Sequence, residues 1–338
     1  MRRFLPAIAV ILLLSGVQAS AHEGKISGYV FGDFYWVAAD HKDSIENSNG
    51  FWIRRAYLTF DQPISERFDA RLRVEASSPG DFVTKDKLTP FIKDAYLRYR
   101  GAQHSVVLGL SASPTWEVVE REWGYRALEK TPLDLQKFGG SRDMGVAFLG
   151  SIGSGNKVRY HVMFGNGSDT ASEVNEGKKI LGSLGFYPSD KLIVEAYVDW
   201  DNLPGDTDRF TVQGFLGYKM AKGRLGFQFA HQTRKSATGA DAKLEIASVY
   251  GVVKLNDRFS GVVRYDRMFD PQPEGDKISY IPFATNAKSN LFLAALDITL
   301  HKKVSLMPNV EAVFYDGQTS GDKPKTDIIP RLTFFFSF

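Results

Sequence analysis

The sequence predicts an all-β fold, a single transmembrane antiparallel β-barrel of about sixteen strands, from three observations. Apolar and polar residues alternate with a period of two along most of the chain, which is typical of strands with different surroundings on their two faces. The segments between these strands alternate between short and long. After residue 21 no stretch approaches about 18 uninterrupted apolar residues, so a bundle of membrane-spanning helices is excluded.

The composition is that of one large ordered domain. The 338 residues include 13% aromatic and 24% charged residues, unlike a disordered or low-complexity chain. There is no cysteine, which excludes disulfides, thiol nucleophiles and c-type haem attachment. The formal net charge of +3 shows no basic excess of the kind that nucleic acid binding requires, and we expect no nucleic acid partner.

The first 21 residues have the pattern of an export signal. Two arginines precede an apolar run from Leu5 to Leu14, and an Ala-Ser-Ala motif precedes His22. The apolar run is near 10 residues long, whereas a membrane-spanning helix needs about 20, which disfavours an N-terminal anchor. We expect residues 1–21 to be cleaved and residues 22–338 to form the exported barrel domain.

The alternation is complete in segments such as 68–76, where one face carries only apolar side chains and the other only charged ones. Segments of this kind predict strands at 25–38, 51–61, 67–76, 91–100, 104–111, 143–150, 156–165, 178–187, 191–200, 209–219, 223–232, 242–255, 259–268, 289–300, 304–315 and 327–338. Strands whose apolar face contacts lipid cannot leave an edge unpaired, so the sheet must close. A soluble β-sandwich or propeller, with the apolar face in a core, is the alternative.

The connections show a regularity that is independent of hydrophobicity. Short turns are predicted at 61–67, 101–104, 151–156, 188–191, 221–223, 256–258 and 301–303. Long loops are predicted at 39–50, 77–90, 112–142, 166–177, 201–208, 233–241, 269–288 and 316–326. Outer-membrane barrels show this asymmetry, with short periplasmic turns and longer extracellular loops.

Aromatic residues fall at both ends of the predicted strands. Those at the outer ends are Trp36, Phe51, Phe164, Trp200 and Phe314, and those at the inner ends are Phe60, Tyr99, Phe186, Tyr218, Phe259 and Phe338. Two such girdles mark the interfaces of a membrane barrel. The pattern therefore favours a barrel in the outer membrane over the soluble alternatives.

Several segments resemble the bacterial outer-membrane porins, and more closely the phosphate-selective porin O and P family. Residues 52–58 resemble that family's second strand and 92–99 its fourth, and the likeness continues at Pro114 and at 141–146. The terminal Phe338 is similar to the final aromatic by which the barrel-assembly machinery recognises such barrels. The resemblance implies a homotrimeric channel in contact with lipid and lipopolysaccharide. Phosphate-selective members have a lysine-rich feature at the pore, and the third long loop here has no lysine cluster.

The longest loop, 112–142, is the candidate constriction. A loop of about 30 residues in a compact fold is usually functional, and the helix formers after Pro114 predict a short helix within it. By resemblance to general porins this loop would fold into the barrel and narrow the pore. Its candidate constriction residues are Trp116, Glu117, Glu120, Arg121, Glu122, Arg126 and Lys130. A surface helix with solvated charges is the alternative.

Strand parity places charged side chains on the face that would line the lumen. The basic candidates are Arg55, Arg71, Arg73, Arg98, Lys157, Arg159, Lys179, Arg224, Lys243, Arg264 and Arg331. Acids on the same face nearly balance them, so we expect only a weak anion preference, from the cluster of Arg71, Arg73 and Arg98. Pairing of each base with a neighbouring acid is the alternative. Arg54 and Arg55 should point to opposite faces, with Arg55 inward.

These observations predict an outer-membrane porin for passive diffusion of small hydrophilic solutes and ions. We expect no catalysis, because His161 is the one histidine on a lumen face and has no partner nearby in sequence. No histidine cluster has metal-ligand spacing, and no cofactor is expected. The alternatives are a structural barrel that acts as a sleeve or docking partner for another secreted protein, such as a cytochrome, and a channel specific for a sugar or an organic acid.

Overall fold

The computed structural model describes residues 23–338. Its strands are β1 (Lys25–Trp36), β2 (Asn49–Pro63), β3 (Phe68–Ser77), β4 (Thr89–Arg100), β5 (His104–Ala112), β6 (Arg142–Ile152), β7 (Val158–Gly165), β8 (Lys178–Phe186), β9 (Leu192–Asn202), β10 (Arg209–Met220), β11 (Gly223–Arg234), β12 (Ala242–Lys254), β13 (Phe259–Met268), β14 (Lys288–His301), β15 (Val304–Asp316) and β16 (Asp327–Ser337). Its helices are α1 (Glu117–Trp123), α2 (Pro132–Leu135) and the short 3-10 helices η1 (Ser154–Asn156) and η2 (Gly275–Lys277). Across residues 23–338, every helix is too short or too polar to cross a membrane.

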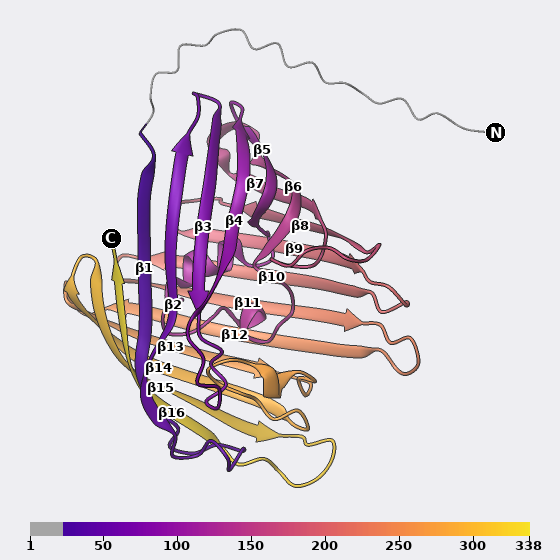
Figure 1. Cartoon of the computed structure of the whole chain (residues 1–338). Helices are drawn as coiled ribbons and strands as arrows, with labels where there is room; N and C mark the ends of the chain where they lie inside the picture. Colours follow the sequence, from indigo (N-terminus) through magenta and orange to yellow (C-terminus); the bar gives the residue numbers. More distant parts are fainter. Residues whose placement is uncertain (1–22) are drawn as a thin grey trace.

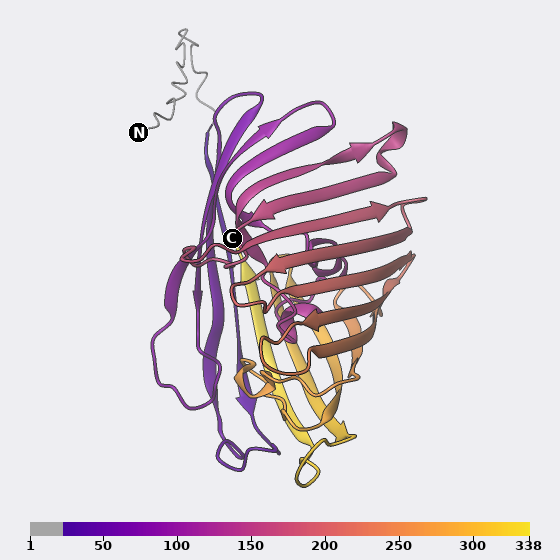
Figure 2. The same cartoon turned by 90° about the vertical axis from the view of Figure 1, so that its right-hand side faces the viewer.

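The sixteen strands form one closed antiparallel barrel (Figures 1 and 2). Each strand pairs with its neighbours in sequence, and β1 closes the barrel by pairing with β16. All sixteen predicted strands are confirmed, and their ends differ from the predicted ends by no more than two residues. The predicted export signal, residues 1–21, lies outside the described residues.

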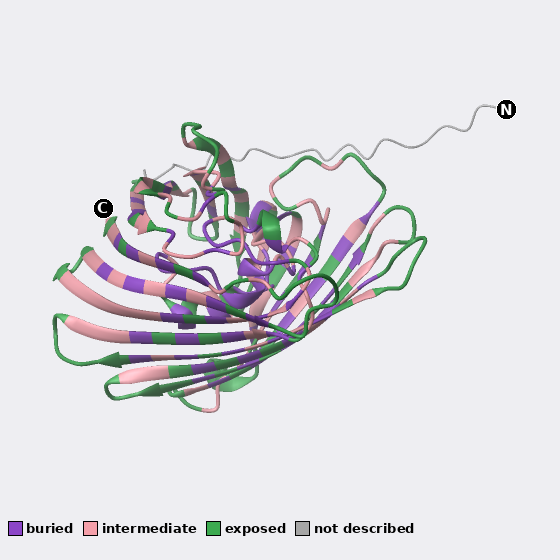
Figure 3. Ribbon diagram, turned by 90° about the horizontal axis from the view of Figure 1, so that it is seen from below, coloured by how far each residue is buried: buried purple, intermediate pink, exposed green. Residues whose placement is uncertain are grey.

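Exposure alternates along the strands, as the banded ribbons of Figure 3 show. In β9, Val194 and Val198 are exposed on the outer face, whereas Tyr197 and Asp199 are buried inside the barrel. An apolar outer face around a polar interior is typical of a membrane barrel, whereas a soluble sandwich buries its apolar face in a core. The prediction of a barrel is therefore confirmed, and the soluble alternative is wrong.

The aromatic residues predicted at the strand ends lie on the outer face. Those that are exposed are Trp36, Phe51, Phe60, Tyr99, Phe164, Phe186, Trp200, Tyr218, Phe314 and Phe338. Phe259 is half-buried. The last residue, Phe338, exchanges two backbone hydrogen bonds with Gly28 and so extends the pairing of β16 with β1.

The connections fall at the two ends of the barrel as predicted. Turns of two to five residues lie at one end, which we call the turn end, and the long loops lie at the other, which we call the loop end. The long loops include L1 (37–48), L3 (113–141) and L7 (269–287).

Loop L3 carries α1 and α2 through the interior of the barrel, as the views in Figures 1 and 2 show. Trp116, Trp123 and Leu128 of L3 form one buried cluster with wall residues such as Phe215 and Tyr250. Burial of these side chains gives the barrel an apolar core around the loop. The prediction that the third long loop folds inward is confirmed, and the surface-helix alternative is wrong.

Loop L7 also folds inward, which the sequence pattern did not predict. Its Ile278, Ile281 and Phe283 pack with Leu135 of α2 and with buried residues of β14, β15 and β16. L7 therefore joins L3 inside the barrel near the loop end.

Candidate pore constriction

Helix α1 ends at a residue whose backbone favours glycine. Gly124 has a φ of 70°, in the left-handed region, and its N–H donates to the carbonyl of Glu120. The guanidinium of Arg224, from β11, donates to the carbonyls of Glu122 at 2.7 Å and Trp123 at 2.8 Å. A cation at this position satisfies the free carbonyls and complements the helix dipole. Arg224 therefore fixes the end of α1 to the barrel wall.

Two buried arginines hold the segment after α1. Arg54 of β2 donates to the carbonyl of Leu128 at 2.8 Å and pairs with the carboxylate of Glu129 at 3.0 Å. Arg264 of β13 donates to the carbonyl of Lys130. Because a buried guanidinium is stable only when its donors and its charge are satisfied, these contacts specify the position of the loop.

The return half of L3 is held through its backbone. Gln232 of β11 donates to the carbonyl of Phe138 at 2.5 Å, and Arg234 donates to that of Lys137 at 2.9 Å. The side-chain amide of Gln272, in L7, donates a hydrogen bond to the carbonyl of Gln136 at 2.5 Å. The loop is therefore attached to the wall and to L7 along its length, and it crosses the lumen as a fixed element.

Burial and neighbouring charges shift the pKa values of two adjacent L3 residues. Burial alone would raise the pKa of Glu129, but the charges of Arg54 and Lys130 outweigh it and hold that pKa well below its usual range. Burial lowers the pKa of Lys130 to about 8, although the nearby Asp134 favours the charged form. Glu129 therefore stays ionised at neutral pH, whereas Lys130 loses its proton at a pH just above neutral.

The adjacent residues Arg54 and Arg55 both lie inside the barrel. The register of β1 against β2 shifts between Phe31 and Gly32, which leaves Arg54 as the extra residue of a β-bulge. Arg55 pairs with Glu75 at 3.0 Å, while Arg54 contacts L3. The expectation that these two side chains point to opposite faces is wrong, because parity along a strand fails at a bulge.

A second bulge acts in the same way on β4. The register of β3 against β4 shifts between Arg73 and Val74, and Lys93 is the extra residue. The Lys93 ammonium lies 2.9 Å from the carboxylate of Glu75, and the next residue, Asp94, is also buried inside, with Arg73 at 3.3 Å. Each bulge therefore adds a cation to the interior that strict alternation would place outside.

Bases from strands β2, β3, β4 and β6 gather on one side of the interior, which we call the basic wall. They are Arg55, Arg71, Arg73, Lys93, Arg98 and Arg142. The acids with which they pair are Asp61, Asp69, Glu75 and Asp94. Every base of the wall therefore has an acidic partner, as the alternative of pairing with neighbouring acids predicts. Some acids pair with two bases, so the wall contains fewer acids than bases.

The side chains of L3 near the basic wall carry both signs of charge. Glu117 lies 2.9 Å from Nδ1 of His161, so this histidine has a partner that is distant in sequence. Arg126 pairs with Asp134 at 3.2 Å. Burial would raise the pKa of Asp134, but Arg126 and Lys130 hold it below its usual value. The loop therefore presents acids and bases together across from the basic wall.

Cavities lie on both sides of L3. One of about 240 Å³ lies between the loop and the basic wall and is bordered by Arg71, Arg98 and Glu117. It shares Glu117 and His161 with a second cavity of about 320 Å³, which extends to Arg159 near the turn end. Another, of about 360 Å³, lies on the β14–β16 side of the loop. Charged side chains border each of these spaces.

The residues predicted for the constriction occupy different environments. Those that border a cavity while remaining accessible are Glu117, Arg121 and Arg126. Those that are buried are Trp116, Glu122 and Lys130. Glu120 is half-buried. Trp116 lies within the apolar cluster, so it supports the fold of the loop and does not line an opening.

The bases predicted for the lumen also occupy different positions in the barrel. Arg55, Arg71, Arg73 and Arg98 belong to the basic wall. Arg224 and Arg264 anchor L3, and Arg331 pairs with Glu311 and donates to the carbonyl of Tyr280 in L7. Arg159 lies 4.3 Å from the centre of the Tyr187 ring near the turn end. Three of the predicted lumen bases are therefore structural supports for the inward loops.

No protein-family model matches the sequence, and no curated protein matches it. Solved structures match it in fold. The anion-selective porin from Comamonas acidovorans is 13% identical, with a TM-score of 0.70, over 94% of this chain and 99% of that chain. The outer membrane channel DcaP of Acinetobacter baumannii is 16% identical, with a TM-score of 0.64, over 96% of this chain and 100% of that chain.

The in-vitro folded trimer form of OmpT, an outer membrane protein of Vibrio cholerae, is 10% identical, with a TM-score of 0.65, over 94% of this chain and 99% of that chain. At these identities the likeness establishes the fold and does not single out the phosphate-selective porin family. The chain has the sixteen-stranded barrel fold of bacterial outer-membrane porins.

Proposed function

We propose that this protein is an outer-membrane porin through which small hydrophilic solutes and ions diffuse passively. One observation carries the proposal: a closed barrel has an apolar outer face and an interior of charged side chains with cavities around L3. An apolar exterior suits lipid, and a polar interior suits hydrated solutes. The names of two similar structures, a porin and an outer membrane channel, support the same function.

The narrowest part of the path would lie between L3 and the basic wall. In this proposal Glu117 and Glu120 face the solute on that side of L3, and Arg126 faces it on the β14–β16 side. Trp116 and Lys130 keep the loop in place. The cavity bordered by Arg71, Arg98 and Glu117 supports this assignment, because it shares Glu117 and His161 with the cavity that extends toward the turn end.

The basic wall would give the channel a weak preference for anions. A cluster of one sign at a constriction tunes which ions pass, and the wall has more bases than acids. We therefore expect small anions to pass somewhat more readily than cations of similar size. The Comamonas acidovorans structure is named as an anion-selective porin, which supports this expectation.

We further propose that the protein is exported to the outer membrane and assembles there with copies of itself. Export would use residues 1–21 as a cleaved signal, and the barrel-assembly machinery would recognise the terminal Phe338. In the membrane the barrel would contact lipid and lipopolysaccharide and form a homotrimer. The similar Vibrio cholerae structure is named as a trimer form, which supports this assembly.

Swelling of liposomes that contain the purified protein tests the proposal. We expect isotonic solutions of neutral sugars to enter at rates that fall smoothly with solute size, since passive diffusion through a fixed opening discriminates by size. Protein-free liposomes are the control. No swelling by correctly inserted barrels would contradict the proposal and favour a structural barrel, and rapid entry of one sugar alone would favour a substrate-specific channel.

A further inference from the structure

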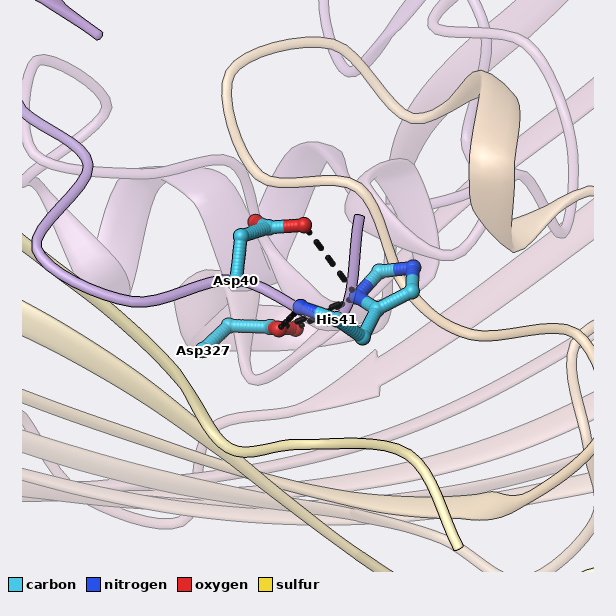
Figure 4. A group of neighbouring side chains, drawn as sticks. All are labelled: Asp40, His41 and Asp327. Atoms are coloured by element: carbon cyan, nitrogen blue, oxygen red, sulfur yellow. Dashed lines mark hydrogen bonds and ion pairs between the residues drawn. The ribbon is translucent and has the colours of Figure 1, made fainter. Parts of the chain in front are cut away.

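A group of two aspartates and a histidine lies at the loop end, where L1 meets β16 (Figure 4). Asp40 and His41 belong to L1, and Asp327 is the first residue of β16. Nδ1 of His41 lies 3.0 Å from Oδ1 of Asp327 and 3.5 Å from Oδ1 of Asp40. One ligand atom from each of these three side chains lies within 4.8 Å of the other two. The fold therefore brings together three groups that commonly bind metal ions.

Within residues 23–338, neither of the two carboxylates forms an ion pair with a lysine or an arginine. Asp40 and Asp327 are both 0% exposed. Among the ion pairs of residues 23–338, each of them pairs with His41 alone. Oδ2 of Asp40 is also buried and accepts no hydrogen bond within that part of the chain. Because buried carboxylates are normally paired with cations or coordinate metals, this environment favours a bound cation.

We propose that Asp40, His41 and Asp327 bind a divalent transition-metal ion, and that Zn²⁺ fits the site best. Zinc binds carboxylate oxygen and imidazole nitrogen at about 2.0–2.2 Å, usually in tetrahedral geometry. Bonds of that length place neighbouring ligand atoms about 3.3 Å apart, close to the 3.0 and 3.5 Å measured from Nδ1 of His41. Calcium and magnesium prefer oxygen ligands, so the imidazole selects against them.

Groups around the site orient its ligands. The hydroxyl of Tyr315 donates to Oδ2 of Asp327, and the backbone N–H of Lys42 donates to Oδ1 of Asp40 at 2.7 Å. Tyr315 in turn accepts a hydrogen bond from the backbone N–H of Ala284, in L7, at 3.1 Å. Such outer contacts hold metal ligands in position. The ion therefore ties L1 to the rim formed by β15 and β16, next to the inward loop L7.

A zinc titration of the purified protein in detergent, stripped with a chelator beforehand, tests the site. We expect isothermal titration calorimetry to show a single Zn²⁺ bound per chain. The variants His41→Gln and Asp40→Asn should bind at least about tenfold more weakly, since loss of even an outer contact weakens metal binding about 10- to 100-fold. His231→Gln is the matched control, because His231 pairs with one carboxylate, Glu245, at 3.0 Å, and should bind zinc as the unmodified chain does.

Three results would overturn the proposal. The first is the absence of stoichiometric zinc binding by the unmodified chain, which needs no variant to fold. The second is equal affinity in the unmodified chain, His41→Gln and Asp40→Asn. The third is equally tight binding of Ca²⁺, which would reject a transition-metal site. Zinc binding and solute diffusion are measured separately, so either proposal can fail without the other.

Discussion

The guanidinium of Arg54 lies 3.0 Å from the carboxylate of Glu129 and joins the barrel wall to the inward loop L3. Both residues are almost fully buried, at 1% and 0% exposure. Removing one partner of such a pair leaves an uncompensated charge in a medium that solvates it poorly. The position of L3 across the lumen therefore depends on buried ion pairing as well as on apolar packing.

Replacing Arg54 with methionine should destabilise the barrel and release L3. We expect the free energy of unfolding to fall by about 3–5 kcal/mol, the usual effect of breaking a buried ion pair, because Glu129 then stays buried without its cation. Urea unfolding followed by tryptophan fluorescence measures the loss, and limited proteolysis reports the release of the loop.

The double variant Arg54→Met, Glu129→Gln is the control for this prediction. It removes both charges, so we expect it to recover a large part of the stability lost in the single variant. A single variant as stable and as protease-resistant as the unmodified protein would contradict the anchoring role of the pair.

Deleting residues 116–130 should raise the single-channel conductance. This segment contains α1 and the stretch fixed by Arg54 and Arg224, and its buried side chains occupy space inside the barrel. Conductance in planar bilayers, at fixed salt, measures the change. Shortening the exposed long loop 235–241 is the matched control and should have little effect, and an unchanged conductance after the L3 deletion would mean that ions bypass the loop.

Neutralising the basic wall should reduce the anion preference. In the variants Arg71→Gln and Arg98→Gln the acids Asp61 and Asp69 lose partners, so the local potential becomes more negative. We expect the chloride-to-potassium permeability ratio, from the reversal potential, to fall in each variant. Arg258→Gln removes a charge from an exposed turn and should leave the ratio unchanged, and equal effects of all three variants would argue against selection at the wall.

The anion preference should also fall as the pH rises through about 8. Burial lowers the pKa of Lys130 to about 8, so this side chain is positive below that pH and neutral above it. Loss of this positive charge on L3 makes the interior less favourable to anions. Reversal potentials measured from about pH 6.5 to about pH 9 test the change, and Lys130→Met should remove the step. A step that persists in the variant would assign the titration to another group.

Alternation along the sequence predicts every strand, because each strand has lipid on one side and the interior on the other. The same rule places the side chain of Arg54 on the wrong face and omits Lys93 from the interior. A β-bulge reverses the alternation of faces, and no residue type in the sequence marks its position. The lipid-facing positions are therefore predictable from period-two patterns. The direction of individual charged side chains near the bulges depends on the pairing with the next strand.

The contents of the lumen were harder to predict, because their contacts join residues far apart in the chain. Arg54 and Glu129 are 75 positions apart, and His41 and Asp327 are 286 apart. The inward loop L7 did leave a signal, since the segment 278–283 is mostly apolar although it lies in a loop. The sequence could therefore have suggested that this loop is buried, but not that it packs against α2.

The most direct test is the single-channel current of the purified protein in a planar bilayer across a potassium chloride gradient. We expect a steady open current with a reversal potential displaced weakly toward that of chloride. A reversal potential toward potassium would contradict the role of the basic wall. The absence of any current, with insertion of the barrel confirmed, would contradict the proposal of a diffusion channel.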